Sequence, residues 1–426
     1  MRKSLLHILF VVPLLAFGQI DQLVTMGPGY GNQVYYSLST GETTAIPLTT
    51  WDIAFSVANR DASVFVNESV NSSQANPTPE VEVYHTAAAD FESADTTNII
   101  DRVYNKEITW AEGAFNSILD EQNPFDLGWG AYNPATNTVN SSTVFFIKLR
   151  NGEYKKLQIV SLISGVYTVR YADLDNSNEV THEIDKADYA GKTLAYLSVE
   201  QDSVMDLEPD SWDMLFTRYW TPLDDGTGTG NILDYMVTGV LTNTGVEVAQ
   251  VDSIDPATVS FADYSSALSD SSLYIIGHDW KNFSLATFSW SLPADRVYFV
   301  KTASDSVWKV QFIGFEGSST GVAAVRRTFA DVATSIKNTF EQVSSYNIYP
   351  NPTQGDLNLE FSLIENISAA QLEVRNQLGQ LIHQETLNVF AGENTKKLDI
   401  PLSQGVYFVS LRNGSSSITK KVICLR

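Results

Sequence analysis

Two pairs of strand-like motifs occur twice in this chain, and the repetition is the feature that most constrains its fold. In each copy a Tyr-containing run precedes a Trp-Asp run, and an aromatic run ending in Lys precedes a Lys-x-Gln run. The first copy has these runs at residues 35–38, 51–55, 144–148 and 156–159, and the second at 196–199, 212–216, 297–301 and 309–312. Because apolar side chains alternate within the runs, each predicts a half-buried β-strand. A strand pattern repeated in order predicts two copies of one β-domain.

Composition supports a β-rich protein outside the cell. The chain has 19 Tyr, 21 Phe and 8 Trp, residues that favour strands. Its one cysteine, Cys424, excludes an internal disulfide, so burial must supply the stability. The formal net charge is -23, from 50 acidic against 27 basic residues. We therefore expect no nucleic-acid partner, because phosphates require a basic face.

The amino terminus has the pattern of a signal peptide. Arg2 and Lys3 precede an almost wholly apolar stretch, and small residues precede Gln19. We assign residues 1–18 to this peptide. No later stretch has the roughly 18 unbroken apolar residues of a membrane-spanning helix, so we expect no transmembrane segment.

The carboxyl terminus carries several short strand-like runs separated by turns. It opens on Tyr-Pro-Asn-Pro-Thr-Gln-Gly, in which two prolines favour extended geometry and a glycine permits a turn. A Leu-Gly-Gln turn, a Gly-Val-Tyr strand and a Lys-Lys pair follow, and the spacing predicts a small β-sandwich. These motifs resemble the type A C-terminal sorting domain of the type IX secretion system. The resemblance implies handling by the type IX translocon and its sortase, and it implicates Pro350, Asn351, Pro352, Gly355, Gly379, Gly405, Tyr407, Lys420 and Lys421.

The repeated strands resemble a second family. Trp-Asp-Met, Arg-Tyr, Arg-Val-Tyr-Phe-Val-Lys and Lys-Val-Gln-Phe in the second copy are similar to motifs of HmuY, a family of secreted and surface haem-binding proteins. The first copy lacks the Arg-Tyr pair and diverges more. The expected organisation is a signal peptide at 1–18, a divergent HmuY-like domain at 19–180, a second at 190–332, a linker at 333–345 and the sorting domain at 346–426.

The family resemblance implies a haem held by two loop histidines, and this chain departs from that pattern. The matching loop positions hold Ser284 in the second copy and Ala131 in the first, neither of which is a good ligand for iron. The remaining candidates for contact with a cofactor or flat ligand are Trp280, His278, Met236 and Trp129. The alternative role for Trp129, Trp280 and Met236 is core packing. Haem stays open as a cofactor, although the expected axial histidines are absent.

No catalytic motif is present, and the scattered histidines do not have the spacing of a metal site. The sequence predicts an all-β protein, secreted or on the outer cell surface. We expect a non-enzymatic binding protein of the HmuY-like type, for haem or another flat hydrophobic ligand. The alternative is a structural or adhesive surface protein that keeps the fold without binding haem.

Overall fold

The computed structural model describes residues 19–73, 78–106, 108–224, 229–284, 286–332, 343–376, 380–413 and 416–425. The expected signal peptide, most of the expected linker and Gly379 lie outside these residues. The chain forms two compact units, Met1–Ala333 and Thr334–Arg426. Within the described residues the regular structure is strands and short 3₁₀ turns, which confirms the predicted all-β class. The turns are η1 (Pro28–Tyr30), η2 (Leu48–Thr50), η3 (Thr96–Asn98), η4 (Ala114–Asn116), η5 (Lys186–Tyr189), η6 (Phe261–Asp263), η7 (Ser265–Ala267) and η8 (Gly317–Ser319).

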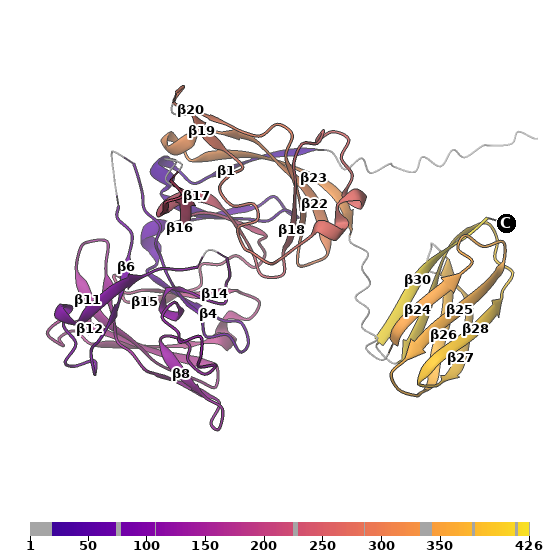
Figure 1. Ribbon diagram of the computed structural model, residues 1–426, viewed down its shortest axis with the longest axis horizontal. Helices are drawn as coiled ribbons and strands as arrows, with labels where there is room; N and C mark the ends of the chain where they lie inside the picture. The colour runs from indigo at the N-terminus through magenta and orange to yellow at the C-terminus, as the bar shows by residue number, and fades with distance from the viewer. Residues whose placement is uncertain are drawn as a thin grey trace, which may run out of the picture. The chain divides into compact units, whose positions relative to one another are not determined.

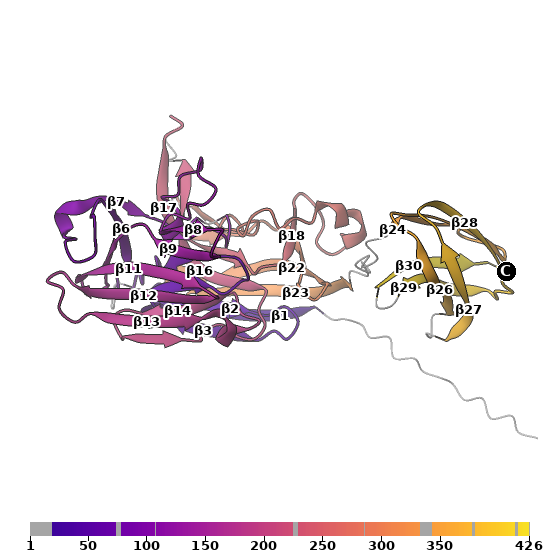
Figure 2. The ribbon, with the colours of Figure 1, turned by 90° about the horizontal axis from the view of Figure 1, so that it is seen from below.

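Four larger sheets build the first unit (Figures 1 and 2). One has the order β1 (Ile20–Thr25), β23 (Val322–Val332), β22 (Ser306–Phe315), β21 (Val297–Lys301) and β18 (Glu247–Val251). Its counterpart has the order β13 (Val180–Asp185), β12 (Val166–Asp173), β11 (Tyr154–Ile163), β10 (Phe145–Lys148), β6 (Glu82–Thr86) and β7 (Ile99–Val103), with β8 (Gly130–Asn133) and β9 (Thr138–Ser141) attached to β11.

Two four-stranded sheets complete this unit. The first runs β15 (Ser203–Met205), β14 (Leu194–Ser198), β4 (Ile53–Ser56) and β5 (Val64–Val66). The second runs β3 (Thr43–Pro47), β2 (Asn32–Tyr36), β16 (Met214–Asp224) and β17 (Ile232–Thr242). A separate hairpin joins β19 (Asn282–Ser284) to β20 (Ser289–Ser291).

The two repeats exchange their first strands. Strand β2 of the first repeat pairs with β16 of the second, and β14 of the second pairs with β4 of the first. Likewise β1 pairs with β23, while β13 pairs with β12 (Figure 2). The sheets therefore do not follow the expected division into 19–180 and 190–332. We call strands β4 to β15 lobe A, and strands β1 to β3 with β16 to β23 lobe B.

The register of the paired strands is the same in both lobes. Tyr196 lies opposite Ala54 in lobe A, and Tyr35 lies opposite Leu215, the repeat equivalent of Ala54, in lobe B. The later hairpins agree as well, since Phe145 faces Leu157 and Tyr298 faces Val310. Matching strand order and register support the predicted duplication of the fold.

Each lobe has its own apolar core, and each core contains exchanged residues. Leu197 from β14 is buried with Ile53 and Phe145 in lobe A. Val34 and Tyr36 from β2 are buried with Met214 in lobe B. Successive residues of a strand point to opposite faces, so the neighbouring Tyr35 and Tyr196 point away from these cores. Those second faces form the candidate site described below.

The second unit is a sandwich of two antiparallel sheets (Figure 1). One sheet has the order β24 (Val343–Tyr349), β25 (Asp356–Leu363) and β28 (Gly392–Asp399). The other has the order β27 (Leu381–Val389), β26 (Ile367–Asn376), β29 (Gly405–Asn413) and β30 (Ser416–Cys424). A shared core includes Leu359, Val374, Val409 and Cys424, as expected for a β-sandwich.

Candidate functional site

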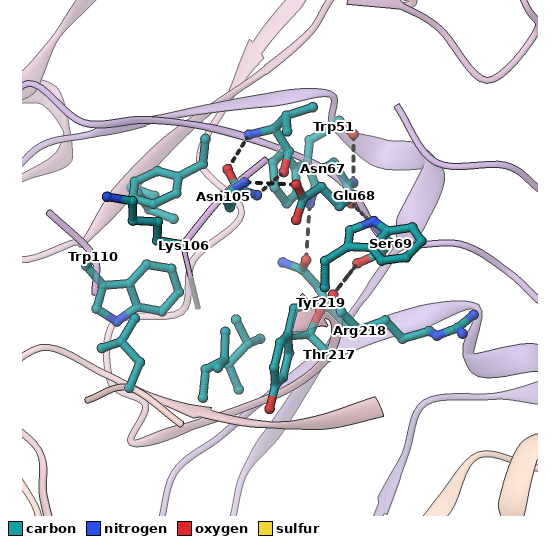
Figure 3. Close-up of a pocket in the computed structure, with 18 of the residues that line it drawn as sticks. Trp51, Asn67, Glu68, Ser69, Asn105, Lys106, Trp110, Thr217, Arg218 and Tyr219 are labelled. Carbon is teal, nitrogen blue, oxygen red and sulfur yellow. Dashed lines mark hydrogen bonds between the residues drawn. The ribbon is translucent and has the colours of Figure 1, made fainter. Parts of the chain in front are cut away.

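A cavity of about 80 Å³ lies where the second faces of the two four-stranded sheets meet (Figure 3). Its walls are mainly aromatic and aliphatic and come from both lobes. Lobe A contributes Trp51, Phe65, Leu194 and Tyr196, and lobe B contributes Tyr35, Leu215, Tyr219 and Leu241. Trp110 lies against residues of both lobes, and Leu273 completes this apolar part of the lining. The exchanged strands β2 and β14 supply one tyrosine each to its lining.

The wall residues Tyr35 and Tyr196 belong to two equivalent aromatic pairs. Tyr35 packs edge-on against Trp212 with ring centres 5.0 Å apart, and Tyr196 packs in the same way against Trp51 at 5.1 Å. The two phenol hydroxyls form a hydrogen bond with each other. Burial raises the pKa of both Tyr35 and Tyr196, so both remain neutral phenols.

One end of the cavity is polar. Asn67, Glu68 and Ser69 follow strand β5, and Asn105 follows β7. The backbone N–H of Asn105 donates to Glu68 Oε1 at 2.9 Å, and its side-chain amide donates to Val66 O at 2.7 Å. The side-chain amide of Asn67 donates to the carbonyl oxygens of Leu48 and Trp51, both at 2.9 Å. These bonds fix the polar groups in place at the edge of the apolar walls.

Trp110 separates the cavity from a wider groove. Its indole N–H donates to Thr242 O at 2.8 Å, which fixes the orientation of the ring. Trp110 and Leu273 also line a groove of about 450 Å³, whose other walls include Asn59, Arg60 and Asp61. The cavity has room for one small apolar group of a ligand, and the adjoining groove has room for a larger polar part.

The ligand candidates from the sequence lie elsewhere. Trp129 is fully buried in lobe A and donates its indole N–H to Ala62 O at 2.8 Å. Trp280 is buried in lobe B, stacked on Phe312 with ring centres 4.1 Å apart. Both rings are thus packed in lobe cores, the role given above as the alternative to ligand contact.

His278 and Met236 are half-buried, and neither lines the cavity. Met236 lies opposite Trp220 in the β16–β17 ladder. Burial lowers the pKa of His278. Among the described residues no group of three or more His, Cys, Asp or Glu side chains has the geometry of a metal site.

The sorting-signal residues from the two ends of the second unit meet in space. Asn351 donates its side-chain amide to Lys421 O at 2.9 Å and accepts from the N–H of Ile423 at the same distance. The N–H of Gly355 donates to Thr353 Oγ1 at 3.0 Å, and the Tyr407 hydroxyl donates to Ser403 O at 3.0 Å. Lys420 reaches Asn347 Oδ1 at 3.4 Å. The Pro350–Pro352 turn and β30 thus form one surface.

Comparison with known families identifies both parts of the chain. Residues 29–173 match the family model described as HmuY protein, and residues 347–425 match the secretion system C-terminal sorting domain. The chain carries an HmuY domain and a type IX sorting domain. It is therefore a secreted, cell-surface protein that the type IX secretion machinery handles.

The other comparisons add no argument about function. No curated protein matches the chain. Dimeric latent PorU from Porphyromonas gingivalis is 10% identical with a TM-score of 0.17, over 95% of this chain and 34% of PorU. Trypsin-activated alpha-2-macroglobulin from Escherichia coli is 9% identical with a TM-score of 0.16, over 96% of this chain and 26% of that one. This chain thus spans about a third or less of either protein, at scores too low to relate the folds.

The HmuY match falls on the first repeat, which the sequence motifs marked as the more divergent. It includes Trp51, Glu68, Asn105 and Trp110, so half of the cavity wall belongs to the HmuY domain. The second repeat remains a predicted copy of that domain. No helix in the described part of the chain is long and apolar enough to cross a membrane.

Sequence reasoning missed the cavity residues. Tyr35, Trp51 and Tyr196 stood in the repeated motifs, but their alternation indicated only a buried face. Glu68, Asn105 and Trp110 lie outside the strands and carry no periodic signal. A Glu between Asn67 and Ser69 directly after an apolar strand was the one available hint of a buried polar group.

Glu68 gives the HmuY domain a predicted pH dependence. Burial raises the pKa of this carboxyl from 4.5 to about 8. Between these values the native state holds a proton that the unfolded chain has released, so the free energy of unfolding falls as pH rises. The loss approaches about 5 kcal/mol once the pH passes 8. Glu68→Gln removes this dependence. The free energy of unfolding of the variant, measured relative to that of the wild type, should therefore rise from pH 5 to pH 9.

Urea unfolding at both pH values measures that difference. Tryptophan fluorescence is the suitable signal, since all eight tryptophans precede the sorting domain. Glu42→Gln, at an exposed position, is the matched control. If the difference in free energy of unfolding between Glu68→Gln and the wild type is the same at pH 5 and pH 9, Glu68 is not the source of the pH dependence.

Proposed function

We propose that this secreted protein is a non-enzymatic binding protein that holds a small, mainly apolar ligand group between its two lobes. The observation that carries the proposal is the cavity, with aromatic side chains on its walls and fixed polar groups at one end. This combination is typical of small-molecule sites, in which apolar walls supply affinity and a few polar groups orient the ligand. The adjoining groove beyond Trp110 would take the rest of the ligand.

Haem does not fit this site. The cavity of about 80 Å³ is far below the roughly 300–1,000 Å³ of sites for drug-sized ligands. No His, Met or Cys lines it. Tyr35 and Tyr196 in its lining are neutral phenols bonded to each other, and a neutral phenol is a poor ligand for iron. The ligand group that we propose is therefore smaller than haem and free of metal.

Cyclopentene, a small ring without polar atoms, tests the site. We expect it to shift the indole N–H resonances of Trp51 and Trp110 when the mature protein is titrated by NMR. Leu241→Phe, which fills the cavity, should abolish the shifts. Leu223→Phe is the matched control, because Leu223 lies on the same hairpin but does not line the cavity. Shifts that survive in Leu241→Phe would place the probe elsewhere.

Haem in the same titration should give only a broad absorbance band, without the sharp Soret and visible bands of a six-coordinate iron. Stacking on a surface aromatic ring would be enough to produce such a band. A well-resolved six-coordinate spectrum that His278→Ala or Met236→Ala abolishes would contradict the proposal. That result would return the protein to the haem-binding members of its family.

The second candidate function is adhesion. It is favoured by the outer part of strand β17, which projects from the unit (Figure 2) and exposes Ile232, Leu233 and Tyr235. Tyr235 is 61% exposed, and grouped apolar side chains at a surface are typical of interaction sites. Adhesion would be favoured if the wild-type protein binds no probe and if cells that carry the Leu233→Ser/Tyr235→Ser variant attach to a surface more weakly than wild-type cells.

For export, we infer that the sortase of the type IX system acts on the sorting domain together with the translocon. The meeting of Asn351 with Lys421 and Ile423 supports a single recognition surface built from both ends of that domain.

A further inference from the structure

The Glu68 carboxyl is the one acidic group in the cavity lining (Figure 3). The residue is only 4% exposed, although it belongs to the polar end of an otherwise apolar space. Its Oε1 atom already accepts the Asn105 N–H at 2.9 Å. When the carboxyl is neutral it carries one O–H, and that proton is a donor for a further partner.

The charged groups around Glu68 are committed to other partners. Arg102 donates to Glu80 Oε1 at 2.9 Å, and Glu80 accepts a second bond from the Trp220 indole at 2.8 Å. Lys106 pairs with Glu112. Arg218 donates to Val70 O at 3.1 Å, and Figure 3 shows its side chain directed away from the cavity.

No Lys or Arg in the described part of the chain forms an ion pair with Glu68. The Arg102 charge favours the ionised carboxylate from a distance, and Glu80 opposes it. Burial outweighs both and raises the pKa of Glu68 to about 8. The carboxyl is thus mostly neutral at neutral pH.

We infer that the neutral Glu68 carboxyl donates a hydrogen bond to an acceptor oxygen of the bound ligand, and that binding weakens as the carboxyl ionises. This inference rests on the proposed function of the cavity and names the chemistry of its ligand. The ligand group is apolar and uncharged and carries one carbonyl or ether oxygen. An ionised carboxylate has no proton to donate and repels such an oxygen, so alkaline pH releases the ligand.

A pair of probes with the same five-membered ring separates this chemistry from simple apolar filling. Cyclopentanone carries an acceptor oxygen, and cyclopentene does not. We expect cyclopentanone to bind at pH 6 and to bind about tenfold more weakly at pH 9.5, the effect of one lost hydrogen bond to a buried group. Cyclopentene should bind equally at the two pH values. Cyclopentylamine is the third probe, because a cation would bind the ionised carboxylate and show the opposite trend.

Glu68→Gln provides the matched variant, since its amide keeps a donor of the same shape at every pH. In this variant cyclopentanone should bind without pH dependence. The ¹³C resonance of the Glu68 carboxyl supplies an independent measurement. A ligand that prefers the protonated form must raise the midpoint of this titration, by thermodynamic linkage.

The outcomes are distinct. Equal cyclopentanone binding at pH 6 and pH 9.5, an unchanged Glu68 midpoint or a preference for the amine overturns the inference and leaves the cavity as a binding site. Binding of none of the probes at either pH overturns the proposed function, and this inference with it.

Discussion

Replacing Trp212 by alanine is expected to lower the free energy of unfolding by about 3–5 kcal/mol. The side chain is only 4% exposed and packs on Tyr35 at 5.0 Å and Trp110 at 6.3 Å between ring centres. Its indole N–H donates to Glu208 Oε1 at 2.8 Å. The substitution therefore opens a cavity and removes a partner from a buried carboxyl, two effects that add.

Urea unfolding followed by tryptophan fluorescence measures this loss. Trp212→Phe separates the two causes, because it keeps an aromatic ring but removes the N–H donor. We expect this variant to lose about 1–3 kcal/mol, the contribution of one hydrogen bond to a buried carboxyl that keeps the Thr193 N–H as a donor to the same oxygen. A loss below about 1 kcal/mol in Trp212→Ala would mean that the two lobes are not packed around this ring.

The repeated strands follow from local sequence patterns, and the structure confirms those predictions. Alternation in 144–148 and 156–159 predicts a hairpin, and β10 and β11 pair as expected. The second repeat behaves in the same way at β21 and β22. Two strands joined by a short turn pair with each other, so the sequence pattern and the closeness along the chain predict the same pairing.

The exchange of the first strands could not be predicted from the sequence. Strands β2 and β14 carry nearly the same motif, with Tyr35 and Tyr196 at equivalent positions. Either strand therefore satisfies the register and burial of either Trp-Asp strand. Their partners depend on the path of the connecting segments and on contacts between the lobes, such as the Tyr35–Tyr196 hydrogen bond. A local pattern specifies a strand, but two equivalent partners leave the pairing open.

The same limit explains why the cavity was missed. Burial of Trp51 and Tyr196 followed from alternation, but alternation does not tell whether two buried faces pack without a gap. The candidates Trp129 and Trp280 lie beside glycines, as ligand-stacking residues often do, yet both fill lobe cores. Large aromatic residues are more often needed for packing than for binding.

Replacing Arg150 by methionine is expected to cost about 3–5 kcal/mol, because it leaves the Asp52 carboxylate buried without its counter-charge. The two side chains are 5% and 1% exposed, and Arg150 Nη1 lies 2.7 Å from Asp52 Oδ1. Asp52 Oδ2 also accepts the Ser198 hydroxyl and the Glu200 N–H, both at 3.1 Å. This aspartate of the Trp-Asp motif therefore holds the end of the exchanged strand β14.

The double variant Asp52→Asn/Arg150→Met distinguishes loss of charge balance from loss of packing. An asparagine oxygen still accepts from Ser198 and Glu200 but carries no charge, so the double variant should be more stable than Arg150→Met alone. Unfolding in urea of the four members of this cycle gives the coupling energy between the two sites. If the double variant is instead no more stable than Arg150→Met, Arg150 acts through its packing and not through its charge. Lobe B offers a natural comparison through Asp213, the repeat equivalent of Asp52. Asp213 accepts the N–H of Leu38, just after the exchanged strand β2, at 2.7 Å. Burial raises the pKa of the Asp213 carboxyl to about 6. Without a directly bonded arginine among the described residues, Asp213 shows what burial does to the motif when the counter-charge is more distant.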